Sequence, residues 1–225
     1  MLVHCTAACT QPSDEATKPP VEKGQETGAE KPGRNPLNAD TRLVMAFGDS
    51  LYAGYNVQQD ESFPAQLEKA LSAKGLNVQV HNAGVSGDTT AAGLQRLAFA
   101  LDGLPRKPDL VILGLGGNDM LRGISPDQTE SNLEAMLQEL KKRGIHVVLT
   151  GMIAAPNMGQ DYASKFNPIY LKLAEKYDAE LYPFFLDGVI TDKALMLPDG
   201  IHPNPKGIAK VVARIDNMVA DELKG

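Results

Sequence analysis

Three residues of this sequence have the types and the spacing that nucleophilic catalysis requires. Ser50 lies in a Gly-Asp-Ser-Leu stretch directly after a short apolar run, and Asp199 and His202 lie in Asp-Gly-Ile-His near the C-terminus. A serine hydroxyl is a weak nucleophile at neutral pH and needs a base to take its proton and a third group to orient that base. Two intervening residues allow one tight turn to place Asp199 against one ring nitrogen of His202, which leaves the other nitrogen for Ser50. The pattern predicts hydrolysis of an acyl bond.

The other histidines are less suited to act as the base. His4 lies near the N-terminus, and His81 ends an apolar stretch that is typical of a strand. His146 begins another such stretch, at the opposite end of a strand from the predicted site. His202 is therefore the candidate base.

Two glycine-containing turns could supply the hydrogen-bond donors that a tetrahedral oxyanion needs. The side-chain amide of Asn118, in Gly-Gly-Asn-Asp, is a suitable donor, although this segment could equally be a glycine turn with local backbone hydrogen bonds. Gly87, in Val-Ser-Gly-Asp-Thr-Thr, could expose its backbone N–H, although a helix cap by Asp88 or Thr89 explains the same segment. The polar clusters follow three predicted strands in turn, which favours one site over unrelated turns.

An apolar segment after the fourth predicted strand is a candidate acyl pocket. Met152, Ile153 and Met158 lie in this segment, and Leu197 lies shortly before the Asp-Gly-Ile-His turn. Methionine suits an adaptable apolar pocket. Equally, Met152 and Ile153 could end a buried strand and belong to the core.

The elements that must position these residues alternate between strands and helices. Five apolar stretches read as strands, and the middle three are almost wholly apolar, as expected for strands covered on both faces; the five are 43–47, 78–81, 110–115, 147–152 and 180–182. This alternation predicts a three-layer α/β domain with a parallel sheet. In such sheets ligands bind beyond the carboxyl ends of the strands, where Ser50, Gly87 and Asn118 are expected.

The predicted helices between the strands have recognisable starts and stops. Ser125 is a predicted N-cap with a proline at the first helical position, and Gly144 is a predicted C-terminal stop. A second helix is predicted from Ser62 to Lys74, and the last one begins at an Asn-Pro pair at residue 204. Each carries an apolar stripe at helical spacing.

The N-terminal part of the chain has a composition unlike the rest. From residue 10 to residue 40 the only large aliphatic residues are Val21 and Leu37, among several prolines and many charged residues. Such a stretch cannot bury enough apolar surface to offset the entropy lost on ordering it. We predict a disordered tail or linker at residues 1–40 and one folded domain at residues 41–225.

Both cysteines, Cys5 and Cys9, lie in this tail, so the predicted domain depends on no disulfide and no thiolate metal site. Cys9 follows Thr-Ala-Ala and precedes a polar, proline-rich spacer, as in the tethering segment of a bacterial lipoprotein, although a basic start and an apolar core are missing. We expect a periplasmic or lipid-tethered protein, with a cytoplasmic one as the alternative. The apolar stretches are too short for a transmembrane segment.

Net charge and side-chain spacing limit the classes of partner and cofactor that we expect. The net charge is −6, and no basic stripe suited to a phosphate backbone is present, so no nucleic-acid partner is expected. No cluster of His, Asp and Glu has the spacing of metal ligands. We therefore expect no metal and no organic cofactor, and a small-molecule acyl ester or thioester as the substrate.

Four blocks of the sequence together form a specific signature: Phe-Gly-Asp-Ser-Leu-Tyr-Ala-Gly-Tyr, Val-Ser-Gly-Asp-Thr-Thr, Leu-Gly-Gly-Asn-Asp-Met-Leu-Arg-Gly and Asp-Gly-Ile-His-Pro-Asn. Through them the predicted domain resembles the SGNH (GDSL) hydrolases, most closely the bacterial thioesterase I, lysophospholipase and arylesterase group. The resemblance implies that Ser50 is the nucleophile, that Asp199 orients His202 as the base, and that Gly87 and Asn118 join the Ser50 amide in binding the oxyanion.

The same resemblance implies a flavodoxin-like fold with a five-stranded parallel sheet. It also implies a serine esterase for aryl and short-to-medium acyl esters, with thioesters and lysophospholipids as further candidate substrates. Two alternatives remain. One is an O-deacetylase of carbohydrate or peptidoglycan, which a polar cleft would favour. The other is a binding module that keeps the scaffold without turnover.

Overall fold

The computed structural model describes residues 1, 38 and 40–224. The chain separates into two units, residues 1–36 and 37–225, and every element described below belongs to the second. The predicted tail at residues 1–40, with Cys5 and Cys9, lies outside the described residues except at positions 1, 38 and 40.

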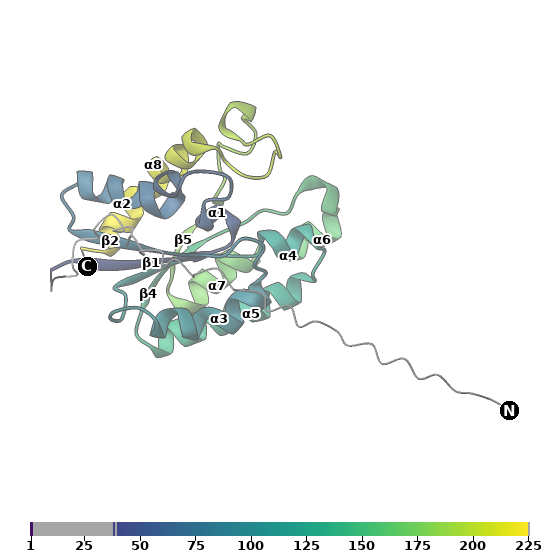
Figure 1. Cartoon of the computed structure of the whole chain (residues 1–225), viewed down its shortest axis with the longest axis horizontal. Helices are drawn as coiled ribbons and strands as arrows, with labels where there is room; N and C mark the ends of the chain where they lie inside the picture. The colour runs from purple at the N-terminus through teal and green to yellow at the C-terminus, as the bar shows by residue number, and fades with distance from the viewer. Residues whose placement is uncertain (2–37, 39, 225) are drawn as a thin grey trace. The chain divides into compact units, whose positions relative to one another are not determined.

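A five-stranded sheet forms the centre of the folded unit (Figure 1). All neighbouring strands are parallel, in the order β2-β1-β3-β4-β5. The strands are β1 (Arg42–Gly48), β2 (Val78–Gly84), β3 (Leu110–Gly114), β4 (His146–Thr150) and β5 (Glu180–Tyr182). The predicted α/β class and five-stranded parallel sheet are confirmed.

Both faces of this sheet are buried. Side chains alternate between the two faces along each strand, so each strand contributes residues to both. In β1, Leu43, Met45 and Phe47 belong to one apolar cluster. Val44 and Ala46 of the same strand belong to a second cluster on the other face. The continuous apolar runs of the central strands therefore reflect two cores.

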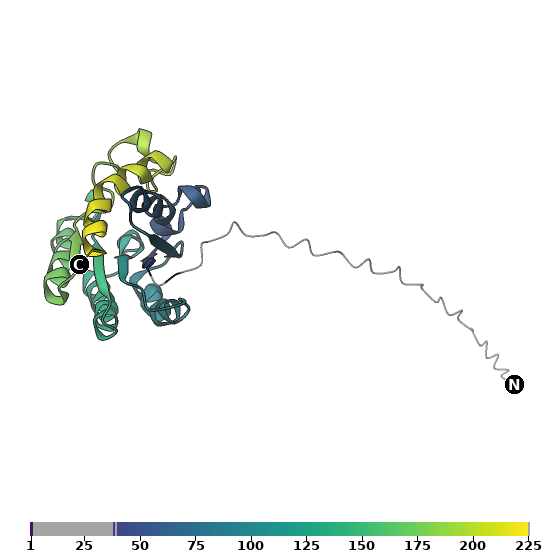
Figure 2. The ribbon, with the colours of Figure 1, turned by 90° about the vertical axis from the view of Figure 1, so that its left-hand side faces the viewer.

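Helices cover the two faces separately, which gives the three layers (Figure 1). One face is covered by α3 (Thr90–Asp102), α5 (Pro126–Lys142), α6 (Gln160–Phe166) and α7 (Ile169–Tyr177). The other is covered by α1 (Ser50–Ala53), α2 (Phe63–Ala73) and α8 (Pro205–Glu222). A short helix, α4 (Gly117–Leu121), follows β3. Figure 2 shows α2 and α8 side by side, in agreement with their contacts.

The predicted helix boundaries match the structure closely. Ser125 caps α5 by accepting a hydrogen bond from the Gln128 N–H at 3.3 Å. Ser62 occupies the N-cap position of α2, but its hydroxyl donates to the Gln59 carbonyl at 2.8 Å rather than capping the helix. None of the helices in residues 40–224 combines the length and the hydropathy that crossing a bilayer requires.

The main difference from the predicted strands is in β2. It continues to Gly84, three residues beyond the predicted end at His81. β2 is an edge strand, and its side chains alternate between buried and half-buried positions as far as His81. Polar residues such as Asn82 are therefore tolerated within it, and the apolar pattern of the sequence stops before the strand does.

Three strands end level with one another at the carboxyl edge of the sheet. Gly48 of β1 pairs with Gly84 of β2 on one side and with Gly114 of β3 on the other. A side chain at Gly48 or Gly114 would lie within 2.5 Å of the Tyr52 ring or hydroxyl, and one at Gly84 within 2.3 Å of the Ala53 nitrogen. These glycines allow α1 to pack directly against the edge of the sheet.

Candidate active site

Ser50 is the first residue of α1, immediately after β1. Asp49 caps this helix, because its Oδ1 accepts a hydrogen bond from the Leu51 N–H at 3.0 Å. The helix has only four residues, and its last turn closes with the Gly54 N–H donating to the Ser50 carbonyl. The packing of α1 on the glycines of the sheet edge therefore sets the position of Ser50.

Asp199 and His202 lie in a tight turn before α8. The Leu197 N–H donates to the His202 carbonyl at 2.7 Å, and the Gly200 N–H donates to the Leu197 carbonyl at 3.0 Å. Asp199 Oδ1 accepts from the backbone N–H groups of Ile201 and His202 at 2.9 and 3.0 Å. The turn orients the second carboxylate oxygen toward the His202 ring.

The three side chains form a continuous hydrogen-bonded chain. Asp199 Oδ2 lies 2.7 Å from His202 Nδ1, and His202 Nε2 lies 2.8 Å from Ser50 Oγ. Partial burial alone would raise the pKa of Asp199. The backbone hydrogen bonds from His202 and Ile201 and the contact with the His202 ring outweigh burial and lower this pKa to about 2. Asp199 is therefore ionised at neutral pH and accepts from His202 Nδ1–H.

Gly87 and Asn118 face the same cleft as Ser50. Gly87 follows β2 and has a φ of +86°, a left-handed conformation that favours glycine. Asn118 belongs to α4, and its side-chain Nδ2 donates to the Asp88 carbonyl at 2.9 Å and lies 3.4 Å from Asp49 Oδ2. The structure thus brings together all five residues that the sequence motifs predicted for the triad and the oxyanion site.

A cavity of about 470 Å³ opens beside these residues. Most of its lining is apolar. The lining residues are Asp49, Ser50, Leu51, Tyr55, Ser86, Gly87, Gly117, Asn118, Met120, Leu121, Met152, Ala155, Leu186, Ile190, Gly200, Ile201 and His202.

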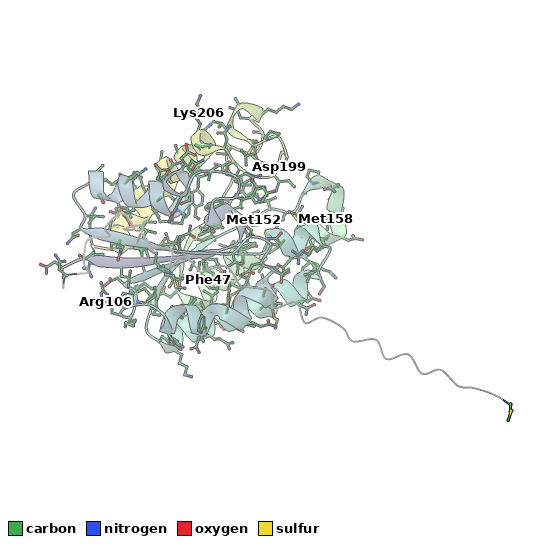
Figure 3. All side chains as sticks on the ribbon, viewed as in Figure 1. Phe47, Arg106, Met152, Met158, Asp199 and Lys206 are labelled. Carbon is green, nitrogen blue, oxygen red and sulfur yellow. The ribbon has the colours of Figure 1, made fainter. Side chains whose placement is uncertain are left out.

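The structure places the four predicted acyl-pocket residues differently. Met152 lines the cavity, whereas Ile153, Met158 and Leu197 are not among the lining residues. Ile153 is 46% exposed, and Met158 packs against the apolar cluster that covers one face of the sheet. Leu197 instead closes the turn that holds Asp199 and His202, through its backbone hydrogen bonds. Within the folded unit, Figure 3 shows Met152, Met158 and Asp199 on the side opposite Arg106.

Sequence reasoning missed the residue that ties the site loops together. Arg96 of α3 donates to the Gly48 carbonyl at the end of β1 and to the Ala83 carbonyl in β2, both at 2.9 Å. Its Nε also pairs with the Asp88 carboxylate at 2.5 Å. The guanidinium lies 4.0 Å from the centre of the Phe47 ring. Arg96 is the only basic residue in α3, and this was the available signal.

Two further carboxyl groups, those of Asp119 and Asp49, are buried next to the site residues. Asp119 is fully buried and accepts hydrogen bonds from the Thr90 N–H at 2.8 Å and from the Thr129 hydroxyl at 3.3 Å. Asp49 is 4% exposed. Burial raises the pKa of Asp49 to about 6, with smaller contributions from Asp88 and Asp119, and the Leu51 hydrogen bond opposes this rise.

The described residues hold no group of three or more His, Cys, Asp or Glu side chains that could bind a metal ion. The arrangement that they do hold is a hydroxyl, an imidazole and a carboxylate in series beside an apolar cavity. Such a series is suited to acyl transfer.

Comparisons with known proteins agree with this geometry. The model of the GDSL-like Lipase/Acylhydrolase family matches residues 46–210. The arylesterase of Vibrio mimicus is 44% identical over 174 residues, which cover 76% of this chain and 86% of that protein. The thioesterase 1/protease 1/lysophospholipase L1 of Escherichia coli K12 is 41% identical over 166 residues, which cover 74% of this chain and 76% of that protein.

Solved structures agree as well. AlinE4, described as a SGNH-hydrolase family esterase, is 50% identical with a TM-score of 0.71, covering 82% of this chain and 98% of that one. The structure of TesA is 35% identical with a TM-score of 0.76, covering 80% and 99%. The family model spans most of the folded unit, and the Vibrio mimicus arylesterase is 44% identical over 76% of this chain, so this chain belongs to the GDSL-like lipase/acylhydrolase (SGNH) family of ester hydrolases.

Proposed function

We propose that this ester hydrolase acts by two-step acyl transfer with Ser50 as the nucleophile. The observation that carries the proposal is the Ser50–His202–Asp199 chain, with contacts of 2.8 and 2.7 Å. In this chain His202 Nε2 accepts the Ser50 proton, and ionised Asp199 stabilises the charge that the imidazole ring gains.

Both steps conserve atoms and protons. In the first, Ser50 Oγ bonds to the acyl carbon, the bond from that carbon to the leaving oxygen or sulfur breaks, and His202 delivers its proton to the leaving atom. In the second, water loses a proton to His202 and attacks the acyl carbon. The acyl–Ser50 bond then breaks, the proton returns to Ser50, and the free acid leaves.

The oxyanion of each tetrahedral intermediate binds the backbone N–H groups of Ser50 and Gly87 and the side-chain amide of Asn118. One Asn118 N–H is held by the Asp88 carbonyl at 2.9 Å. The other makes only a long contact of 3.4 Å with Asp49 and is available to the oxyanion, while the bond to Asp88 holds the planar amide in place. Donors that are held in place before the reaction are the most effective ones.

The substrate class that fits best is an ester with a short-to-medium acyl chain. The cavity beside Ser50 is lined on its apolar side by Leu121, Met152, Ala155, Leu186 and Ile190. Burial of the methylene groups of an acyl chain in such a lining makes the binding free energy more favourable. The same chemistry extends to thioesters and lysophospholipids, in keeping with the names of the relatives. An O-deacetylase would need a polar cleft, which this lining does not favour.

The test is covalent labelling together with kinetics. A p-nitrophenyl butyrate assay of the wild-type protein should show turnover, and an alkyl phosphonate should label Ser50. Ser50→Ala should lose at least 10³-fold in kcat, because residual catalysis then comes only from binding and the oxyanion donors. An unchanged melting temperature would show that the fold remains. Labelling that persists in Ser50→Ala would identify another nucleophile. An acyl-CoA panel separates thioesterase from esterase activity.

We propose, in addition, that the protein is exported and carries a lipid on Cys9. The support is the Thr-Ala-Ala-Cys stretch followed by a polar spacer, all outside the described residues. Partition of the wild-type protein into the detergent phase of Triton X-114, and of Cys9→Ser into the aqueous phase, is the expected result. Equal partition of the two would exclude the tether.

A further inference from the structure

Tyr55 contacts both His202, through its ring, and Ser50, through its backbone. Its ring centre lies 4.4 Å from that of the His202 imidazole, with the two planes tilted by 32°. Its backbone N–H donates to the Ser50 carbonyl at 3.2 Å. Tyr55 is placed there by the left-handed Gly54 that ends α1.

The Tyr55 ring also lines the cleft and is open to solvent. Tyr55 and Ile201 both line the cavity beside His202, and they are 42% and 43% exposed. A large aromatic side chain that is left this exposed beside a cavity is available to a ligand. Together the two side chains form an apolar surface next to the imidazole.

The chemistry of the proposed reaction determines which part of the substrate reaches this surface. His202 Nε2 must deliver its proton to the leaving oxygen, so that oxygen lies within hydrogen-bond distance of the ring. The group attached to the oxygen therefore begins beside His202, where Tyr55 and Ile201 are. The acyl chain is attached to the carbonyl carbon, which Ser50 attacks.

We propose that Tyr55 forms the leaving-group subsite and selects for aromatic leaving groups by stacking against them. The inference rests on the proposed function and extends it to the alcohol side of the ester. Stacking of an aromatic leaving group on Tyr55 should be worth about threefold to tenfold in rate, which corresponds to about 0.6–1.4 kcal/mol.

The experiment compares phenyl butyrate with cyclohexyl butyrate, which share an acyl group and have leaving groups of similar size. In Tyr55→Leu we expect kcat/KM for the phenyl ester to fall about threefold to tenfold, while that for the cyclohexyl ester stays within about twofold. Tyr55→Phe should keep the preference of the wild type. Phe99→Leu removes another exposed aromatic, on α3, and is the matched control.

A second measurement separates a leaving-group contact from support of His202. Enzyme carbamoylated with phenyl N-methylcarbamate recovers activity by hydrolysis, a step that has no aryl group but needs the same histidine. Recovery should proceed at the wild-type rate in Tyr55→Leu. If recovery slows as much as phenyl ester hydrolysis, or if both esters lose equally, Tyr55 only holds His202 and the proposal is wrong. A wild-type protein inactive on both esters would instead overturn the proposed function itself.

Discussion

Asp49 is a buried ionisable side chain that immediately precedes the proposed nucleophile in the sequence. Its carboxyl group caps α1 and lies 3.4 Å from the Asn118 amide. Burial raises its pKa from 3.8 to about 6. The folded state therefore holds this proton more tightly than the unfolded chain does. The contribution of Asp49 to stability is complete below pH 3.8 and is lost as the pH rises through about 6.

Asp49→Asn should remove this pH dependence, because asparagine keeps the oxygen that caps α1 but does not ionise. The pKa values of 3.8 and about 6 correspond to a loss of about 2 kcal/mol in wild-type stability between pH 4.5 and pH 7.5. Relative to the wild type, the free energy of unfolding of Asp49→Asn should rise by about that amount over the same interval. Urea unfolding at the two pH values measures it, with the exposed Asp127→Asn in α5 as the control. An equal difference at both pH values would contradict the assignment.

At the scale of elements, Arg96 joins the end of β1 to the end of β2 and to the loop that follows β2. It binds the end of β1 before Ser50, the carbonyl of Ala83 in β2, and Asp88 beside Gly87. Asp88 in turn holds Asn118 through its backbone carbonyl. Two of the three proposed oxyanion donors, Gly87 and Asn118, are thus connected through Asp88 to one guanidinium group on α3.

Arg96→Met should therefore reduce both stability and turnover. The change leaves the Asp88 carboxylate unpaired and removes one donor each from the Gly48 and Ala83 carbonyls, although the Val85 N–H still donates to Gly48. We expect this to cost about 2–4 kcal/mol in unfolding free energy. We expect kcat to fall about tenfold or more with a smaller change in KM, since the donors act mainly in the transition state. Arg96→Lys restores the charge but not the three-way fork, and should recover stability more than kcat. A full kcat in Arg96→Met would confine this residue to a structural role.

At the scale of the whole molecule, the cleft is assembled from segments that are distant in sequence. Ser50 follows β1, Gly87 follows β2, Asn118 follows β3, Met152 follows β4, and His202 precedes α8. Because all five strands are parallel, the loops at their carboxyl ends meet at one edge of the sheet. Substrate preference is therefore a property of several loops together.

The cavity of about 470 Å³ predicts an optimum in acyl-chain length. Each buried methylene adds about 0.8 kcal/mol, so kcat/KM should rise up to about fourfold per methylene from acetyl until the cavity is full, and then level or fall. Met152→Ala enlarges the cavity and should move the optimum toward longer chains. A p-nitrophenyl ester series measures both profiles, with Met158→Ala as the control in the same loop. A maximum at acetyl that ignores Met152→Ala would favour a deacetylase.

Much of the fold and of the site follows from local features of the sequence. Strand–helix alternation and unbroken apolar runs indicated a parallel sheet with two cores. The Gly-Asp-Ser-Leu and Asp-Gly-Ile-His motifs predicted Ser50, Asp199 and His202 as the triad, and the structure places the three side chains within hydrogen-bond distance in series. These motifs are readable because each turn depends on residues that are close in sequence: Asp199 and His202 are three positions apart and already share a hydrogen bond.

Only the tertiary structure decided which side chains share the cleft. Met158 and Leu197 were plausible acyl-pocket residues by composition, yet the loops direct them elsewhere, while Leu186 and Ile190 line the cavity. The contacts of Arg96 and Tyr55 could likewise not be predicted from the sequence. Their partners lie up to 147 positions away along the chain, and only folding brings them together. Local hydrogen bonds require particular residues at fixed short spacings, so they can be recognised in the sequence as a motif. The packing of separate loops against one another leaves no such pattern.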